Sequence, residues 1–226
     1  MGCNLSAIVA GVDEVGRGCL FGPVVAAAVI LPDSALPHLL LAGVTDSKRL
    51  TSAQRTNLVQ QIRSQATDCR IGLASVREID RLNILQASLL AMRRSVSRLK
   101  VQPTLCLVDG NQPIPGLLIP QQTLVQGDSR SLAIAAASII AKVWRDELMT
   151  RLAPKYPEYG LAKNKGYGTV AHRDALRRFG PTRWHRLSFR PCQPSEKAKL
   201  ESQTIGLWSG TIATLDTGSE SLAQAE

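Results

Sequence analysis

Residues 7–18 read AIVAGVDEVGRG, and the rest of the predicted architecture follows from their pattern. The first six are apolar or small and include β-branched residues, which predicts a strand over residues 7–12 that leads directly into Asp13 and Glu14. A second apolar run spans residues 24–31 and is joined to the first by a glycine-containing connection. Two such runs in succession predict neighbouring antiparallel strands.

The downstream sequence alternates between strand-like and helix-like segments. Thr51 and Gln54 have the spacing of a capping box, which predicts a helix over residues 52–66. Apolar residues recur at steps of three and four in two longer segments, which predicts helices over residues 79–99 and 129–152. Short apolar runs predict further strands at residues 69–76, 104–108 and 117–125. This alternation predicts an α/β protein with a mixed sheet covered by helices.

Composition divides the chain into three predicted parts. Residues 1–153 carry the predicted strands and long helices and form the expected core. Residues 154–200 are rich in Gly, Pro, Arg and aromatic residues, which indicates a smaller helical or irregular region. Residues 201–226 contain four acidic and no basic residues, with frequent Ser, Thr and Gly, which predicts a disordered acidic tail.

Length and composition exclude several classes of protein. A chain of 226 residues with 44% hydrophobic residues suits a single domain with a sizeable core. Its longest apolar run falls far short of the roughly 20 residues that span a bilayer. No secretory signal is visible, so we expect a soluble, cytoplasmic protein without a membrane partner. Five cysteines without CxxC spacing argue against a disulfide framework and a zinc site.

The positive charge of the chain is unevenly distributed. The net charge is +9, and residues 129–200 carry fifteen Lys and Arg against five Asp and Glu. A basic region of this size fits a polyanionic partner, most simply nucleic acid. Charge alone leaves a solvated basic surface without a partner as an open alternative.

Four carboxylates sit at the ends of predicted elements: Asp13 and Glu14 after the first strand, Asp109 after another, and Asp128 before a long helix. Binding sites in open α/β sheets lie beyond the carboxyl ends of strands, so these side chains can converge. Neighbouring carboxylates repel each other unless cations neutralise them, and their oxygens suit Mg²⁺ and Mn²⁺. Taken singly, each acid also fits a turn or cap role, with Asp128 as a candidate helix N-cap.

Seven motifs occur in order along the chain. They are GVDEVGRG at residues 11–18, DSK at 46–48, IDRLNI at 79–84, VDGN at 108–111, GDS at 127–129 followed by AASIIAKVWRD at 136–146, KGYGT at 165–169 with His172, and HRLSFRP at 185–191. The set resembles the signature of the type 2 ribonucleases H, in particular bacterial ribonuclease HII, and the similarity extends over residues 7–191.

This resemblance implies a fold and an activity. The implied fold is ribonuclease H-like, with a mixed five-stranded sheet, flanking helices and a small C-terminal helical region. The implied enzyme is an endonuclease that uses Mg²⁺ or Mn²⁺ to hydrolyse the RNA strand of RNA–DNA hybrids. It also incises 5′ to ribonucleotides embedded in duplex DNA, leaves 5′-phosphate and 3′-hydroxyl ends, and acts in ribonucleotide excision. The catalytic metal ligands carry over to Asp13, Glu14, Asp109 and Asp128.

The same resemblance assigns contacts with the substrate. Family members read the ribose 2′-hydroxyl with backbone groups of the GRG segment and the tyrosine of KGYGT, here Gly16, Arg17, Gly18 and Tyr167. Glycines permit close approach of the backbone to a sugar, and the 2′-hydroxyl distinguishes RNA from DNA. Further candidates for contacts with phosphates are Ser47, Lys48 and Lys142. An ordinary charge on a helix face is the alternative for Lys142.

Three other polar residues have two interpretations each. Asp146 lies four residues after Lys142, so we expect the two to pair on one helix face rather than Asp146 to bind a metal. His172 and His185 could act as general bases or could serve hydrogen bonding and packing. The second role is favoured because bound metal ions would already activate water.

Two other functions compete with this interpretation. A noncatalytic hybrid-binding protein would keep the basic surface but lose the metal cluster, and the presence of all four carboxylates counts against it. The sister type of ribonuclease H prefers long hybrids and has an added N-terminal substrate-binding domain, whereas the signature here begins near Ala10. The expected partners are RNA–DNA hybrids and ribonucleotide-containing duplex DNA, bound by a monomer.

Overall fold

A five-stranded sheet lies at the centre of the structure, a computed structural model that describes residues 7–193. Its strands are β1 (Val9–Val15), β2 (Val24–Ile30), β3 (Asp68–Ala74), β4 (Leu105–Asp109) and β5 (Gln121–Leu124). They lie in the order β3-β2-β1-β4-β5. β2 is antiparallel to both β1 and β3, whereas β4 is parallel to β1 and β5 is parallel to β4. The predicted mixed five-stranded sheet is confirmed.

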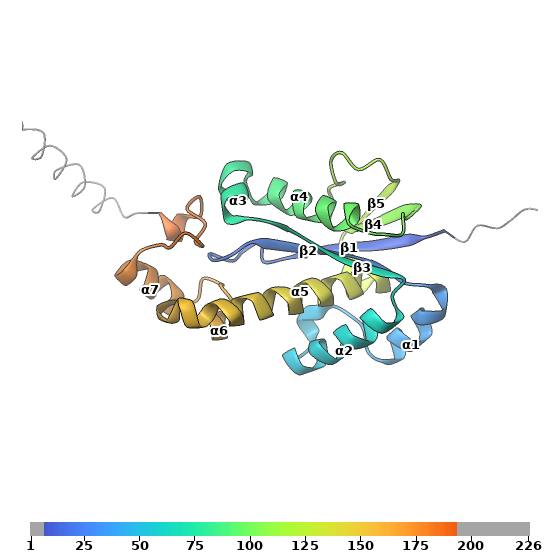
Figure 1. Cartoon of the computed structure of the whole chain (residues 1–226), viewed down its shortest axis with the longest axis horizontal. Helices are drawn as coiled ribbons and strands as arrows, with labels where there is room; N and C mark the ends of the chain where they lie inside the picture. The colour runs from blue at the N-terminus through green and yellow to red at the C-terminus, as the bar shows by residue number, and fades with distance from the viewer. Residues whose placement is uncertain (1–6, 194–226) are drawn as a thin grey trace, which may run out of the picture. The chain divides into compact units, whose positions relative to one another are not determined.

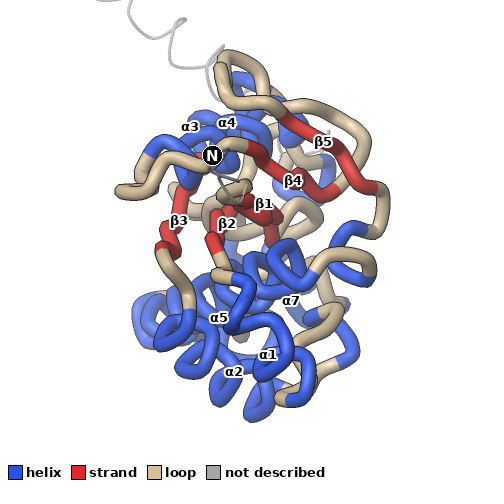
Figure 2. The backbone as a smooth tube through the Cα atoms, turned by 90° about the vertical axis from the view of Figure 1, so that its right-hand side faces the viewer, coloured by secondary structure: helices blue, strands red, loops and turns tan. Residues whose placement is uncertain are grey.

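Helices cover both faces of this sheet (Figure 1, Figure 2). One face carries α3 (Val76–Leu82) and α4 (Ile84–Ser97), and the other carries α1 (Leu36–Leu41), α2 (Ser52–Gln65) and α5 (Leu132–Leu152). β2 is buried along its whole length, and its side chains alternate between the two layers. Val25, Ala27 and Val29 pack on the α5 side, and Val24, Ala26 and Ala28 pack on the α4 side.

Strand β1 and helix α5 approach each other closely at Gly11. A Cβ atom added to Gly11 would lie 2.1 Å from the carbonyl carbon of Ala133, so any other residue would push the helix away from the strand. This contact sets the first turns of α5 across β1, close to the two acids that the strand carries.

The C-terminal part of the described chain packs against the core. It contains α6 (Leu161–Asn164), α7 (Val170–Phe179) and short 3₁₀ turns, and its apolar residues contact Leu20, Phe21 and Met149. Asp80 of α3 accepts hydrogen bonds from the backbone N–H groups of Leu187 at 3.1 Å and Ser188 at 2.9 Å. The described residues through Cys192 therefore belong to one compact unit.

The prediction of one continuous helix over residues 79–99 is wrong, because the structure has two helices there. Asn83 adopts a positive φ of 70° and separates α3 from α4, and its side-chain oxygen caps α4 by accepting from the N–H groups of Leu85 and Gln86. The apolar periodicity continues across the break, which explains why the pattern predicted a single helix.

Three other predicted boundaries change in the structure, and one helix was not predicted. The strand predicted over residues 7–12 spans Val9–Val15, so Asp13 and Glu14 lie within β1 rather than after it. The strand predicted over residues 117–125 shortens to β5, which begins only after Pro120 because proline has no N–H to donate to a neighbouring strand. The helix predicted from residue 129 begins at Leu132. Helix α1 was not predicted, since its six residues are too few to show a clear apolar period.

Three further predictions concern membrane-spanning segments, disulfides and the C-terminal tail. Within residues 7–193, no helix is both long enough and apolar enough to cross a membrane. Cys19, Cys69, Cys106 and Cys192 are free thiols, in agreement with the predicted absence of a disulfide framework from the described part. The predicted disordered tail, residues 201–226, lies outside the described residues.

Candidate active site

One cavity of about 310 Å³ collects most of the predicted site residues. Asp13 and Glu14 reach it from β1, and Asp109 reaches it from the end of the parallel strand β4. Of the eleven predicted residues, ten line this cavity: Asp13, Glu14, Gly16, Arg17, Gly18, Ser47, Lys48, Asp109, Lys142 and Tyr167. The convergence expected at the carboxyl ends of neighbouring strands is therefore present.

Asp128, the eleventh predicted residue, lies directly beside the cavity. It belongs to a 3₁₀ turn and is 7% exposed, and its Oδ2 accepts a hydrogen bond from Lys48 Nζ at 3.3 Å. The preceding residue, Gly127, donates its N–H to Asp109 Oδ1 at 2.7 Å. The alternative role of Asp128 as the N-cap of α5 is wrong, because Ser131 caps that helix through the N–H of Ile134.

The acids in the cavity raise one another's pKa values. Burial, and then the charges of Glu14 and Asp109, hold the pKa of Asp13 well above its usual value. Burial also raises the pKa of Glu14, with Asp109 adding to the effect and Arg17 opposing it. Burial and the charge of Asp128 raise the pKa of Asp109. The cavity thus concentrates negative charge that the protein only partly neutralises.

This donor set fits a divalent cation. Glu14 has one basic partner, Arg17, at 3.2 Å, and Lys48 reaches Asp128, but no salt bridge within the described residues reaches Asp13 or Asp109. Carboxylate oxygens are the ligands that hard divalent cations prefer. No three acidic, His or Cys side chains of residues 7–193 form a ready-made metal site. The acids are therefore gathered in one cavity without being set in a closed coordination shell.

Lys142 and Tyr167 form one wall of the cavity. Lys142 Nζ lies 5.4 Å from the centre of the Tyr167 ring, and burial raises the pKa of the Tyr167 hydroxyl to about 12. Lys142 also pairs with Asp146 at 2.9 Å, which confirms the expected contact between residues four apart on one helix.

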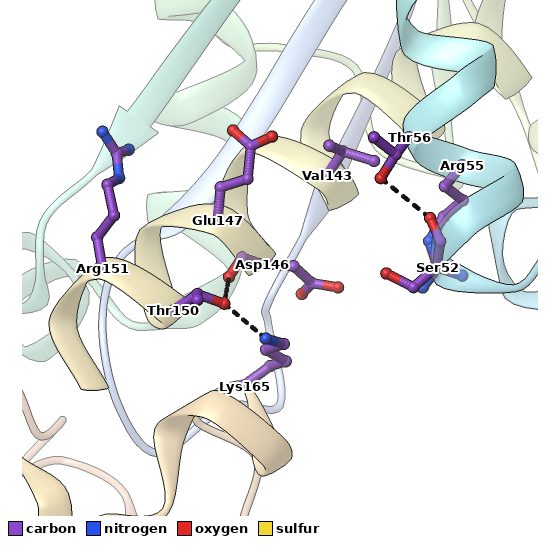
Figure 3. A pocket seen from close by; sticks show the side chains of 9 residues that line it. All are labelled: Ser52, Arg55, Thr56, Val143, Asp146, Glu147, Thr150, Arg151 and Lys165. Carbon is purple, nitrogen blue, oxygen red and sulfur yellow. Dashed lines mark hydrogen bonds between the residues drawn. The ribbon is translucent and has the colours of Figure 1, made fainter. Parts of the chain in front are cut away.

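Asp146 faces a second cavity of about 350 Å³ between α2 and α5 (Figure 3). In this cavity Lys165 Nζ donates to Thr150 Oγ1 at 2.7 Å, and the Thr150 hydroxyl donates to the Asp146 carbonyl at 2.9 Å. Arg55 lines both cavities, so they adjoin each other.

Sequence reasoning missed Ser138 and Arg55 as residues of the candidate site. Ser138 and Ser47 share a hydrogen bond of 2.9 Å between their buried hydroxyls, so Ser47 is already engaged inside the protein. Ser138 lies one helical turn before Lys142, and that spacing was a usable signal. Arg55 donates to the carbonyls of Ser47 and Leu50, and nothing in the sequence around it indicated such a position.

His172 and His185 form a buried pair outside the lining of the cavity. The backbone N–H of Thr182 donates to His185 Nδ1 at 2.9 Å, so the proton of His185 must be on Nε2. That Nε2 donates to His172 Nε2 at 3.1 Å, and His172 Nδ1 then donates to the Tyr167 carbonyl at 2.9 Å. Both rings are therefore neutral, and the pair serves hydrogen bonding and packing, the role favoured from the sequence.

Comparison with known proteins agrees with this geometry. A family model described as Ribonuclease HII matches residues 10–192. Ribonuclease HII of Trichodesmium erythraeum is 67% identical over 186 residues, which cover 82% of this chain and 88% of that protein. Ribonuclease HII of Nostoc sp. is 64% identical over 192 residues, 85% of each chain. The crystal structure of ribonuclease H2 from Pyrococcus horikoshii OT3 superposes with a TM-score of 0.72 at 26% identity and covers 86% of this chain and 98% of that one. The chain therefore belongs to the ribonuclease HII family of nucleases.

Proposed function

We propose that this enzyme hydrolyses the RNA strand of RNA–DNA hybrids and also incises duplex DNA on the 5′ side of an embedded ribonucleotide. The products carry 5′-phosphate and 3′-hydroxyl ends. The observation that carries the proposal is the shared cavity, in which three carboxylates face the GRG loop and Tyr167. One cavity therefore offers groups for phosphodiester chemistry and groups that can recognise a sugar.

The chemistry rests on the carboxylates. Asp13, Glu14, Asp109 and Asp128 would hold Mg²⁺ or Mn²⁺, since burial and mutual repulsion leave these acids in need of positive charge. When bound, such ions supply activation of the attacking water and neutralisation of the leaving oxygen. The scissile phosphate would contribute oxygen ligands as well.

Basic side chains around the acids offset their repulsion of the substrate. Lys48 has an 82% exposed side chain at the edge of the cavity, and Lys142 lies beside Tyr167. Both can contact phosphates of the backbone, which is the main source of affinity in protein–nucleic acid complexes. Tyr167 is 38% exposed, so its ring is available to stack on a sugar or base.

The test is a cleavage assay on a labelled duplex that contains one ribonucleotide, with Mg²⁺, with Mn²⁺ and with a chelator. We expect one cut on the 5′ side of the ribonucleotide in either metal and none with the chelator. An all-DNA duplex of the same sequence should stay intact, and a long RNA–DNA hybrid should be cut at several positions.

The pattern of products separates the alternatives. Cleavage of the long hybrid without a cut at the single ribonucleotide would contradict the proposed incision. Tight binding of the hybrid with no cleavage in any metal would indicate a noncatalytic binding protein. Cleavage that persists in the chelator would contradict the role assigned to the carboxylates.

A further inference from the structure

Two arginines are completely buried behind the GRG loop. Arg145 of α5 and Arg186 each have 0% exposure, and neither has a carboxylate within salt-bridge distance among residues 7–193. A buried charge without an acidic partner is rare, because removing it from water is unfavourable unless hydrogen bonds replace the lost hydration. Burial lowers the pKa of Arg186 to about 10, which still leaves it protonated at neutral pH.

Backbone carbonyls take the place of the missing carboxylates. Arg186 donates through Nη2 to Gly16 at 2.7 Å, through Nη1 to Arg17 at 2.8 Å and through Nε to Gly22 at 2.9 Å. Arg145 donates to the carbonyls of Phe21 at 2.9 Å, Pro23 at 3.3 Å and Lys165 at 2.8 Å. Five of these six carbonyls belong to the segment of residues 16–23, so the two guanidinium groups bind this loop from inside.

This arrangement fixes the direction of two amide groups. In a planar trans peptide, the N–H of one residue points opposite to the carbonyl of the residue before it. Because Arg186 holds the carbonyls of Gly16 and Arg17 inward, the N–H groups of Arg17 and Gly18 point outward. Neither N–H donates to any of the described residues, and both residues line the candidate active site. A Cβ atom added to Gly18 would meet nothing within 4 Å, so this side of the loop is open.

Gly16 shows that the loop and Arg145 are fitted to each other. Gly16 has a φ of 89°, and a Cβ atom there would lie 2.2 Å from Arg145 Nε. A larger residue would displace the guanidinium group, so Gly16 provides both the turn and the space that Arg145 occupies.

We infer that Arg186 and Arg145 are positioning residues that hold the outward-facing N–H groups of Arg17 and Gly18 ready to bind the ribose 2′-hydroxyl. The inference rests on the proposed function and extends it to two side chains that do not line the cavity. Arg186 acts directly on the two peptide groups. Arg145 supports the base of the loop and, through the Lys165 carbonyl, the segment that leads to Tyr167.

The test is Arg186→Lys, which keeps the positive charge but replaces the three-point donor with a single ammonium group. Binding is measured with a chelator present, on one duplex with a single ribonucleotide and one all-DNA duplex. We expect the preference for the ribonucleotide to fall by about tenfold, the size of one lost hydrogen-bonded contact. Affinity for the all-DNA duplex should change by less than about twofold, since phosphate contacts dominate it. The matched control is Arg190→Lys at an exposed position, which should keep the preference of the wild type.

A second measurement covers the case in which Arg186→Lys does not fold. Amide hydrogen exchange in the wild type should show fast exchange at Arg17 and Gly18, and protection at Leu20 and Gly22, whose N–H groups donate to carbonyls at 2.8 Å. The single-ribonucleotide duplex should protect Arg17 and Gly18 more strongly than the all-DNA duplex does. Equal protection by the two duplexes would overturn the inference.

The outcomes separate this inference from the proposed function. If the wild type cuts no ribonucleotide-containing substrate, the proposed function fails whatever the variants show. If the wild type cuts normally and Arg186→Lys folds and keeps its preference for the ribonucleotide, the proposed function stands and the positioning role is wrong.

Discussion

The charged groups on the two sides of the GRG loop are partnered differently. In front of it, Asp13, Glu14 and Asp109 share a cavity in which Arg17 is the one described basic side chain that forms a salt bridge with any of these three acids. Behind it, Arg145 and Arg186 are buried with no carboxylate in contact among the described residues. The acids in front repel each other. The guanidinium groups behind the loop donate hydrogen bonds to its backbone carbonyls. The protein itself thus neutralises the acids only in part, whereas it supplies the arginines with hydrogen-bond acceptors.

This difference indicates where an external partner can bind. An acid that the protein neutralises only in part is a candidate for binding a cation, as the proposed function requires. A buried arginine whose hydrogen bonds are complete within the protein stabilises the fold and the loop that it contacts. Substitution of an acid in front of the loop should therefore reduce cleavage more than stability. Substitution of an arginine behind it should reduce the free energy of unfolding strongly.

The largest expected effect is on cleavage by Asp109→Asn. The asparagine keeps an oxygen that can accept from the Gly127 N–H, but it removes one of the charges that attract a cation. We expect cleavage to fall by about a thousandfold or more, because loss of one residue from a catalytic unit disables the whole unit. The free energy of unfolding in metal-free buffer should stay equal or rise, since a repulsive charge is removed. Cleavage assays and urea titration measure the two effects.

A matched control for that substitution is Asp174→Asn, in a half-exposed side chain that pairs with Arg177. It should leave cleavage unchanged. Normal cleavage by Asp109→Asn in magnesium would show that Asp109 is not needed as a metal ligand. It would also contradict the proposed difference between the acids in front of the loop and the arginines behind it.

Arg145→Leu tests the basic side of the comparison. It leaves the carbonyls of Phe21, Pro23 and Lys165 without their donor in the interior. We expect the free energy of unfolding to fall by about 3 kcal/mol or more, since each buried carbonyl without a donor costs about 1–3 kcal/mol. Urea unfolding monitored by circular dichroism measures it, with Arg151→Leu at an exposed position as the control. Equal stability of the two variants would show that the buried arginine does not stabilise the fold.

The neutral pair of His172 and His185 should make the stability of the protein depend on pH. Burial lowers the pKa of His185 from 6.5 to about 4, and burial also lowers the pKa of His172. As the pH falls, these histidines are therefore protonated in the unfolded chain before they are protonated in the folded protein. The free energy of unfolding should decrease as the pH falls from about 6.5 towards about 4. For one proton bound on unfolding, each pH unit in this range changes the free energy of unfolding by about 1.4 kcal/mol. His185→Gln should reduce this slope, and His38→Gln at an exposed position should not; equal slopes in the wild type and His185→Gln would contradict the assignment.

The smallest expected effect comes from a conventional, partly exposed ion pair. Arg94 binds both oxygens of Glu78 at 2.7 Å and 2.9 Å, and this contact lowers the pKa of Glu78 to about 2. Glu78→Gln should lower the free energy of unfolding at pH 7 by about 1 kcal/mol, the upper range for an exposed pair. The difference from wild type should disappear as the pH falls from 4.5 towards about 2, because the native carboxylate becomes protonated. Urea midpoints at pH 7 and pH 3 check it, and exposed Glu158→Gln should show no such change.

The sequence was a good guide to the carboxylates and a poor guide to what supports them. Asp13 and Glu14 lie in the last part of β1 and Asp109 ends the parallel strand β4, and the carboxyl ends of neighbouring parallel strands lie at the same edge of a sheet. The GRG loop and Tyr167 came from motif resemblance and line the same cavity. Their roles in binding metal and sugar remain predictions that the experiments above address.

The supporting residues lie within motifs, Arg186 in HRLSFRP and Arg145 in AASIIAKVWRD, but the motifs gave no indication of their role. Arg145 and Arg186 resemble ordinary members of a basic region, because a sequence does not show that an arginine is buried against carbonyls far along the chain. The break at Asn83 was hidden for a similar reason, since the apolar period that predicts a helix continues through a capped interruption. Long-range hydrogen bonds determine the position of the arginines, and local backbone conformation determines the break at Asn83. Neither produces a periodic pattern in the sequence.

Helix α5 has a consequence for how this protein can change during evolution. Ser138 and Lys142 face the candidate site, Arg145 reaches behind the loop, and Gly11 holds the start of the helix against β1. Inserting or deleting one residue between Lys142 and Arg145 would rotate everything beyond it by about 100° and turn the arginine away from its carbonyls. Homologous chains should therefore vary in residue type along the outer face of α5 while keeping the number of residues between these positions constant.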